Sequence, residues 1–161
     1  MHFHGYIAID WSGDKNKFQK GIKVALIEDE NKPPIIVKPS ENFRYWNRDS
    51  IVNWIEKITF KNNYLIGIDF SFSYPFCDSE SYFPGLCLSP KTPLKLWRLI
   101  ENINKKQQNF YGGEIWKTSP FSKYYNSPFH KGILFKSRRR LTEIVAKKVL
   151  SPSPTFNCVG P

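Results

Sequence analysis

The stretch GYIAIDWSGD, residues Gly5–Asp14, decides how the rest of the chain is read. Residues 6–9 form an apolar run that is typical of a strand entering a core. The run ends on a carboxylate, Asp10, and the small residues Ser12 and Gly13 follow closely. Because an ionised carboxylate is costly to bury, its place at the tip of a core strand calls for a capped turn, a charged partner or a metal ion.

A second stretch repeats this arrangement. YLIGID, residues 64–69, is another apolar run that ends on a carboxylate, Asp69. Its nearly continuous apolar character predicts a central strand covered on both faces. Each carboxylate alone is explained as the cap of its own turn, Asp10 on an amide two or three residues further on and Asp69 on that of Ser71. Together, after such similar strands, the two favour one shared site.

Two more strands and a helix are predicted between these stretches. Residues 21–27 form a hairpin with the first strand across the polar segment 14–20, and the prolines around 33–39 suit a third strand at a sheet edge. A helix is predicted over residues 47–60, capped by Asn47, Asp49 or Ser50. Its apolar positions share one face because they recur at helical spacing: Ile51, Trp54, Ile55 and Ile58.

Further elements are predicted in the second half of the chain. Residues 92–107 read as a helix with Thr92 as its cap and Pro93 in its first turn. Residues 137–150 are a third helix candidate, and residues 155–159 are a further strand candidate. The predicted fold is therefore a single α/β domain over residues 1–161, with a mixed sheet in a three-layer arrangement.

The element order β-β-β-α-β-α is that of the opening of an RNase H-like fold, and the actin and sugar-kinase ATPases share it in outline. In the RNase H-like topology the first and fourth strands lie side by side. Asp10 and Asp69 would then converge at one end of the sheet. Since adjacent carboxylates repel without a cation between them, this pair predicts a site for Mg²⁺ or Mn²⁺.

The charge of the chain is unevenly spread. The net charge is +10; residues 1–80 hold 10 Lys/Arg and 11 Asp/Glu, whereas residues 81–161 hold 14 and 3. A basic half suits a polyanion such as nucleic acid, although ordinary lysine-rich solubility explains it equally well. Three cysteines without a CxxC pair favour reduced thiols in the cytoplasm. We find no signal peptide and no apolar run of membrane-spanning length.

A compact cationic run, Arg138, Arg139 and Arg140, opens the third helix candidate, with Lys136 close by. These side chains are candidates for contacts with nucleic-acid phosphates. A solvated helix face, with Glu143 paired to one of the arginines, is the competing interpretation. The aromatic loop at residues 70–83 likewise suits either base stacking or packing against the sheet.

Four segments together resemble the DUF429 family of predicted RNase H-like nucleases: AIDWSG, IGIDFSFSYP, RRRLTE and SPSPTFNCVGP. The resemblance implies that Asp10 and Asp69 match the first two acidic positions and that Glu143 is a third. It implies hydrolysis of phosphodiesters with two metal ions, Asp10 bridging both and Asp69 binding one. Family members continue beyond the VGP segment, so a last strand and helix are expected to be missing here.

Two other functions remain open from the sequence. The chain could be an inactive or truncated domain that binds nucleic acid or protein without cleaving it. It could also be a phosphotransferase of the ATPase group, in which Ser12 and Gly13 follow the acid in a phosphate-binding hairpin. Ser12 is accordingly a candidate for substrate binding in either enzyme.

Overall fold

A computed structural model describes residues 2–39, 43–69, 74–138 and 144–145. The chain divides into two compact units. Unit 1 contains the described residues up to 69 together with Gln108–Phe110, and unit 2 contains the other described residues from 74 to 145. None of the helices in these ranges is long and apolar enough to cross a bilayer.

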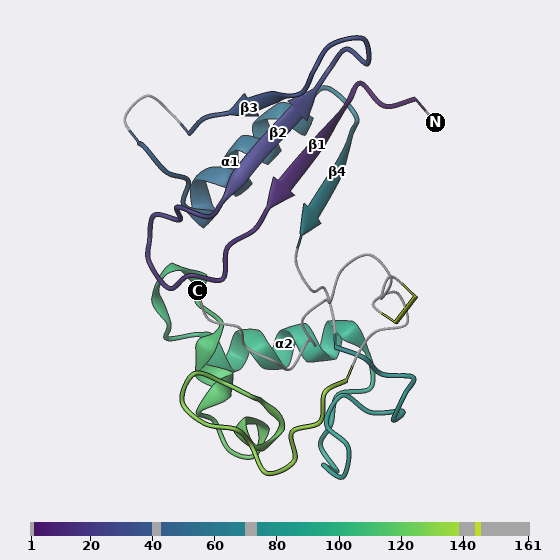
Figure 1. The fold of residues 1–161 in the computed structure, drawn as a ribbon, viewed down its shortest axis with the longest axis vertical. Coiled ribbons are helices and arrows are strands. Elements are labelled where there is room, and N and C mark those ends of the chain that lie inside the picture. Colours follow the sequence, from purple (N-terminus) through teal and green to yellow (C-terminus); the bar gives the residue numbers. More distant parts are fainter. Residues whose placement is uncertain (1, 40–42, 70–73, 139–143, 146–161) are drawn as a thin grey trace. The chain divides into compact units, whose positions relative to one another are not determined.

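Unit 1 is built on a four-stranded mixed sheet in the order β3-β2-β1-β4. Its strands are β1 (Gly5–Asp10), β2 (Lys23–Ile27), β3 (Ile35–Val37) and β4 (Tyr64–Asp69). β2 pairs antiparallel with both β1 and β3, whereas β1 and β4 run parallel (Figure 1). The predicted hairpin, the edge position of the third strand and the coarse α/β class are thus confirmed.

The helix α1 (Arg48–Thr59) covers one face of this sheet. Buried residues alternate along β1, where Ile7 and Ile9 are each 2% exposed, and Ile51 of α1 is fully buried against that face. The partly buried Trp54, Ile55 and Ile58 complete the predicted apolar face of the helix. Burial of these alternate strand residues drives the packing of helix on sheet.

The other face of the sheet differs from the prediction for residues 64–69. β4 ends the sheet instead of lying at its centre, and Leu65 on its open face is 50% exposed. The apolar run misled because only its alternate residues, including Ile66 and Ile68, pack on the core, while Gly67 adds no side chain to either face. Within the described residues of unit 1, α1 is the helix layer, so the expected three layers are not seen there.

Both long helices begin where the sequence predicts. Asn47 caps α1 by accepting a hydrogen bond from the Ser50 amide at 2.8 Å, and the Ser50 hydroxyl accepts one from the Asn47 amide at 3.1 Å. α2 (Pro93–Asn104) starts after Thr92, whose hydroxyl accepts from the Lys95 amide at 3.3 Å. These reciprocal bonds satisfy backbone donors that the first helical turn leaves without partners.

Unit 2 has a separate, strongly aromatic core around α2. Its buried residues come from the helix, the preceding loop and two short 3-10 helices, η2 (Gly113–Trp116) and η3 (Phe121–Tyr124): Tyr82, Phe83, Leu96, Ile115, Tyr124 and Tyr125. The burial of Tyr82 and Phe83 supports packing over base stacking for these two residues. Cys77 and Cys87 are free and exposed. Of the predicted third helix only residues 137, 138, 144 and 145 are described, and the strand candidate at 155–159 lies outside the described residues.

Candidate functional site

Asp10 and Asp69 lie directly opposite each other at one end of the sheet. They are the last residues of the parallel strands β1 and β4, and the register pairs them with each other. Neighbouring strands are about 4.8 Å apart, so the two carboxylates project from adjacent positions. Both residues are exposed on the face that α1 does not cover. The juxtaposition expected from the order of the strands is therefore present.

The turn after β1 is organised by residues other than Asp10. The Ser12 hydroxyl accepts a hydrogen bond from the Asp14 amide at 3.3 Å, and Asp14 in turn accepts from the Asn16 amide at 2.9 Å. That amide lowers the pKa of Asp14 below its ordinary value. Among the described residues, the Asp10 carboxylate caps no amide of this turn, which leaves it available to a ligand.

Arg48, the first residue of α1, holds this turn in place. Its guanidinium donates to the carbonyl oxygens of Ser12 at 3.1 Å, of Asp14 at 2.9 Å and of Asn109 at 2.5 Å. The Asn109 side chain also donates to the carbonyl of Lys15 at 3.3 Å. Arg48 thereby fixes the backbone that directly follows Asp10. Nothing in the sequence singles out Arg48 for this role, because its acceptors are backbone groups.

A third charged residue belongs to the same row of the sheet. Lys23, the first residue of β2, pairs with Asp10 in the antiparallel register and is exposed on the same face. The row therefore runs Lys23, Asp10, Asp69 across three strands. Sequence reasoning missed Lys23, although the predicted hairpin already placed the start of its second strand opposite the end of the first.

Arg138 corrects one of the sequence predictions. Its side chain is buried at 8% exposure and donates to both carboxylate oxygens of Asp78, at 2.8 and 2.5 Å. It also donates to three backbone carbonyls, at 2.7 to 2.9 Å: those of Pro75, Ser81 and Tyr82. A guanidinium so engaged closes a loop of unit 2 and is not positioned to contact a phosphate.

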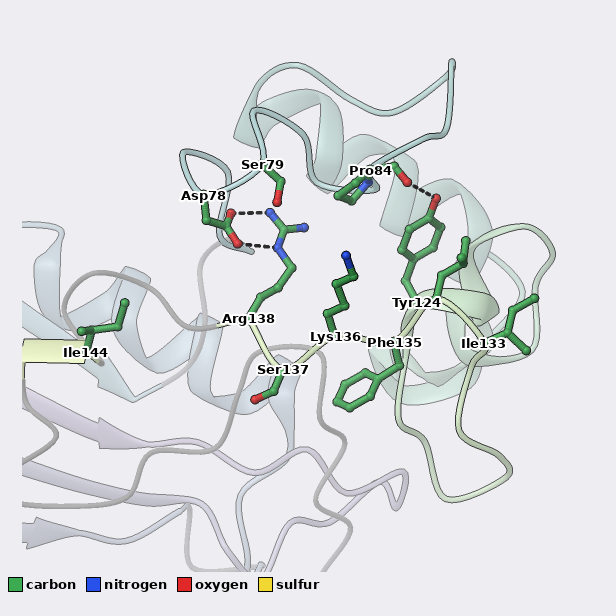
Figure 2. Close-up of a pocket in the computed structure, with 11 residues that line it drawn as sticks. Asp78, Ser79, Pro84, Tyr124, Ile133, Phe135, Lys136, Ser137, Arg138 and Ile144 are labelled. Carbon is green, nitrogen blue, oxygen red and sulfur yellow. Dashed lines mark hydrogen bonds and ion pairs between the residues drawn. The ribbon is translucent and has the colours of Figure 1, made fainter.

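Lys136 occupies a different environment. It lines a cavity of about 630 Å³ in unit 2, and Figure 2 shows its side chain directed between Arg138 and Tyr124. Tyr124 forms part of the wall and donates a hydrogen bond to the Pro84 carbonyl at 2.7 Å (Figure 2). Arg139, Arg140 and Glu143 lie outside the described residues.

Metal ligands are sparse in the described part of the chain. Within those ranges, no group of three or more His, Cys, Asp or Glu side chains is gathered closely enough to hold a metal ion. The candidate site thus consists of two carboxylates and a lysine. No protein-family model matches the chain, and comparisons with curated proteins and with solved structures found no match.

Proposed function

We propose that the chain is a metal-dependent nuclease with an RNase H-like fold. The observation that carries the proposal is the in-register pairing of Asp10 with Asp69 at the ends of parallel β1 and β4. The strand order and directions around this pair are those expected of that fold. Support also comes from the exposure of both carboxylates on the uncovered face of the sheet.

The two carboxylates fit the requirements of Mg²⁺ or Mn²⁺. Proteins commonly hold Mg²⁺ with one or two carboxylates and leave its other positions to water and substrate phosphate. Asp10 and Asp69 would supply those oxygens. When bound, such an ion polarises a phosphodiester and lowers the pKa of coordinated water. A second ion would need further ligands, and the proposed third acid, Glu143, lies outside the described residues.

The protein's own residues have defined tasks in this proposal. Asp10 and Asp69 bind and orient the cation, and Arg48 keeps the backbone after Asp10 in one conformation through its bonds to Ser12 and Asp14. Ser12 shapes the turn through its bond to the Asp14 amide. The partner is nucleic acid, whose charge suits the net charge of +10.

Cleavage of labelled DNA and RNA, single- and double-stranded, tests the proposal when Mg²⁺ or Mn²⁺ is titrated against an EDTA control. We expect Asp10→Asn and Asp69→Asn each to lower the cleavage rate by about a hundredfold or more, because an amide no longer attracts the cation. Glu56→Gln, an exposed carboxylate-to-amide change on α1, is the matched control. Cleavage at the wild-type rate by Asp10→Asn, or none by the wild type with either metal, contradicts the proposal.

A further inference from the structure

A basic groove lies beside the carboxylate pair in unit 1. It has a volume of about 740 Å³ and is lined by residues from the start of β2, the end of β3 and the segment before α1. The cations that line it are Lys20, Lys23, Lys38 and Arg44. No acidic residue is among its described lining, and no ion pair within the described ranges engages these four side chains.

The sheet register connects this groove to the acids. Val24 pairs with Val37 in the antiparallel β2–β3 ladder, so Lys38, which follows Val37, lies across from Lys23. Lys23 pairs with Asp10 in turn, and Asp10 pairs with Asp69. One end of the sheet therefore carries two cations followed by two anions on neighbouring strands. Like charges side by side destabilise a sheet, and a polyanion bound with a divalent cation would relieve both repulsions.

Backbone hydrogen bonding holds the far wall of the groove in place. The Gln19 amide donates to the Trp46 carbonyl at 2.7 Å, which ties the segment before α1 to the residues leading into β2. Trp46 is 5% exposed and packs edge-on against Trp54 of α1. The groove is thus anchored to the hydrophobic core of unit 1.

Exposed aromatic rings border the same groove. Phe43, one of its lining residues, is 46% exposed and stacks on Phe18 with ring centroids 5.3 Å apart. Lys17 places its ammonium 5.8 Å from the Phe18 ring centroid, and the Arg44 guanidinium lies 5.3 Å from that of Tyr45. Cations interleaved with accessible rings are typical of surfaces that bind unpaired nucleotides, phosphates on the cations and bases on the rings.

We infer that this groove binds single-stranded nucleic acid and leads its backbone to Asp10 and Asp69. The inference rests on the proposed function in taking the polyanion to be the nuclease substrate. Lys23 and Lys38 would contact phosphates next to the carboxylate pair, and Arg44 would contact one further along. Phe43 would stack on a base.

Binding without cleavage tests this inference directly. Fluorescence anisotropy of a labelled 12-nucleotide single strand is followed in EDTA over a range of salt concentrations. We expect Lys38→Gln/Arg44→Gln to weaken binding roughly tenfold and to make the slope of log K against log salt shallower by about 1.4, since each lost phosphate contact removes about 0.7 from single-strand binding. The control Lys57→Gln/Lys61→Gln, with the same loss of charge outside the groove, should leave the slope unchanged.

Substitutions at Phe43 test the choice of a single strand. Phe43→Leu should weaken single-strand binding roughly tenfold without changing the salt slope, because it removes stacking but no charge. Phe43→Trp should bind like the wild type. Duplex binding should be insensitive to both changes. Equal sensitivity of duplex and single strand to Phe43→Leu would overturn the assignment to unpaired nucleotides.

The outcomes separate this inference from the proposed function. A wild-type slope in Lys38→Gln/Arg44→Gln, or no binding by the wild type, overturns the groove even if the chain cleaves nucleic acid. Binding that depends on the groove, with no cleavage in either metal, keeps the groove and contradicts the nuclease. Circular dichroism spectra that match the wild type establish that each variant is folded.

Discussion

Arg138 and Asp78 show how strongly a single pair of side chains can determine a loop. The guanidinium is 9% exposed and the carboxylate 38%, and Arg138 also binds the carbonyls of the loop that carries Asp78. Removing one partner of such a pair leaves the other charge buried and uncompensated. The pair is therefore a determinant of the stability of unit 2.

The same pair predicts a pH dependence. The hydrogen bond from Arg138 lowers the pKa of Asp78 below its ordinary value. Because the unfolded-state pKa is higher, near 3.9, the ionised carboxylate contributes its full stability above that value. The contribution is lost as the pH falls through the folded-state pKa. We expect Asp78→Asn to lower the free energy of unfolding by about 2 kcal/mol at pH 7, and by progressively less as the pH falls below about 4.

Urea denaturation at several pH values measures this difference. Asp29→Asn is the control, because Asp29 forms an exposed ion pair with Lys32 at 3.1 Å. Such pairs contribute about 0.5 kcal/mol or less. A loss in Asp78→Asn no greater than that in Asp29→Asn would show that the Arg138 pair does not stabilise unit 2.

Sequence reasoning had little access to partners of this kind. Arg138 stands in a cationic run that suggests phosphate contacts, whereas its acceptors lie about 60 residues earlier in the chain. Lys23 and Arg48 were missed for related reasons, since the importance of each depends on a neighbour supplied by the fold. In contrast, Asp10 and Asp69 could be singled out because each ends an apolar strand, a pattern visible within a few residues.

At the scale of elements, local signals were informative. α1 begins after Asn47, one of three cap candidates, and its apolar positions face the sheet as their spacing predicts. The strand order beyond nearest neighbours was less accessible. β4 was expected at the centre of the sheet, but an apolar run of six residues does not reveal that one face remains open.

The cap of α1 gives a prediction at this scale. Asn47→Ala removes the acceptor for the Ser50 amide, and we expect the free energy of unfolding to fall by about 1 kcal/mol. Asn53→Ala, at an exposed position within the helix, should be neutral or slightly stabilising because alanine has the higher helix propensity. Chemical denaturation compares the two variants. Equal stabilities would rule out a stabilising cap at Asn47.

At the scale of the whole molecule, the fold redistributes charges that the sequence intermingles. Counts by halves of the chain point to a basic C-terminal half, yet the groove in unit 1 gathers its cations from a half that is nearly neutral. The reason is the hairpin geometry. The acids Glu28, Asp29 and Glu30 follow β2 at one end of the sheet, while Lys23 and Lys38 lie at the other.

The opposed carboxylates predict an effect on the stability of the whole molecule. Without metal, Asp10 and Asp69 repel each other, so we expect Asp10→Asn to melt about 1–2 °C higher than the wild type in EDTA. Mg²⁺ should raise the melting temperature of the wild type but not that of the variant. Differential scanning calorimetry of both proteins, with Glu56→Gln as control, measures the shifts. An identical response of Asp10→Asn and wild type to Mg²⁺ would argue against a cation at this pair.

The alternation along β1 has a consequence for evolution. Ile7 and Ile9 face the core, whereas Ala8 and Asp10 face the open side of the sheet. Mutations on the open side can therefore change chemistry without disturbing the packing that keeps the chain folded. A strand of this kind lets natural selection, or a protein engineer, exchange ligands at its tip while inheriting an unchanged scaffold.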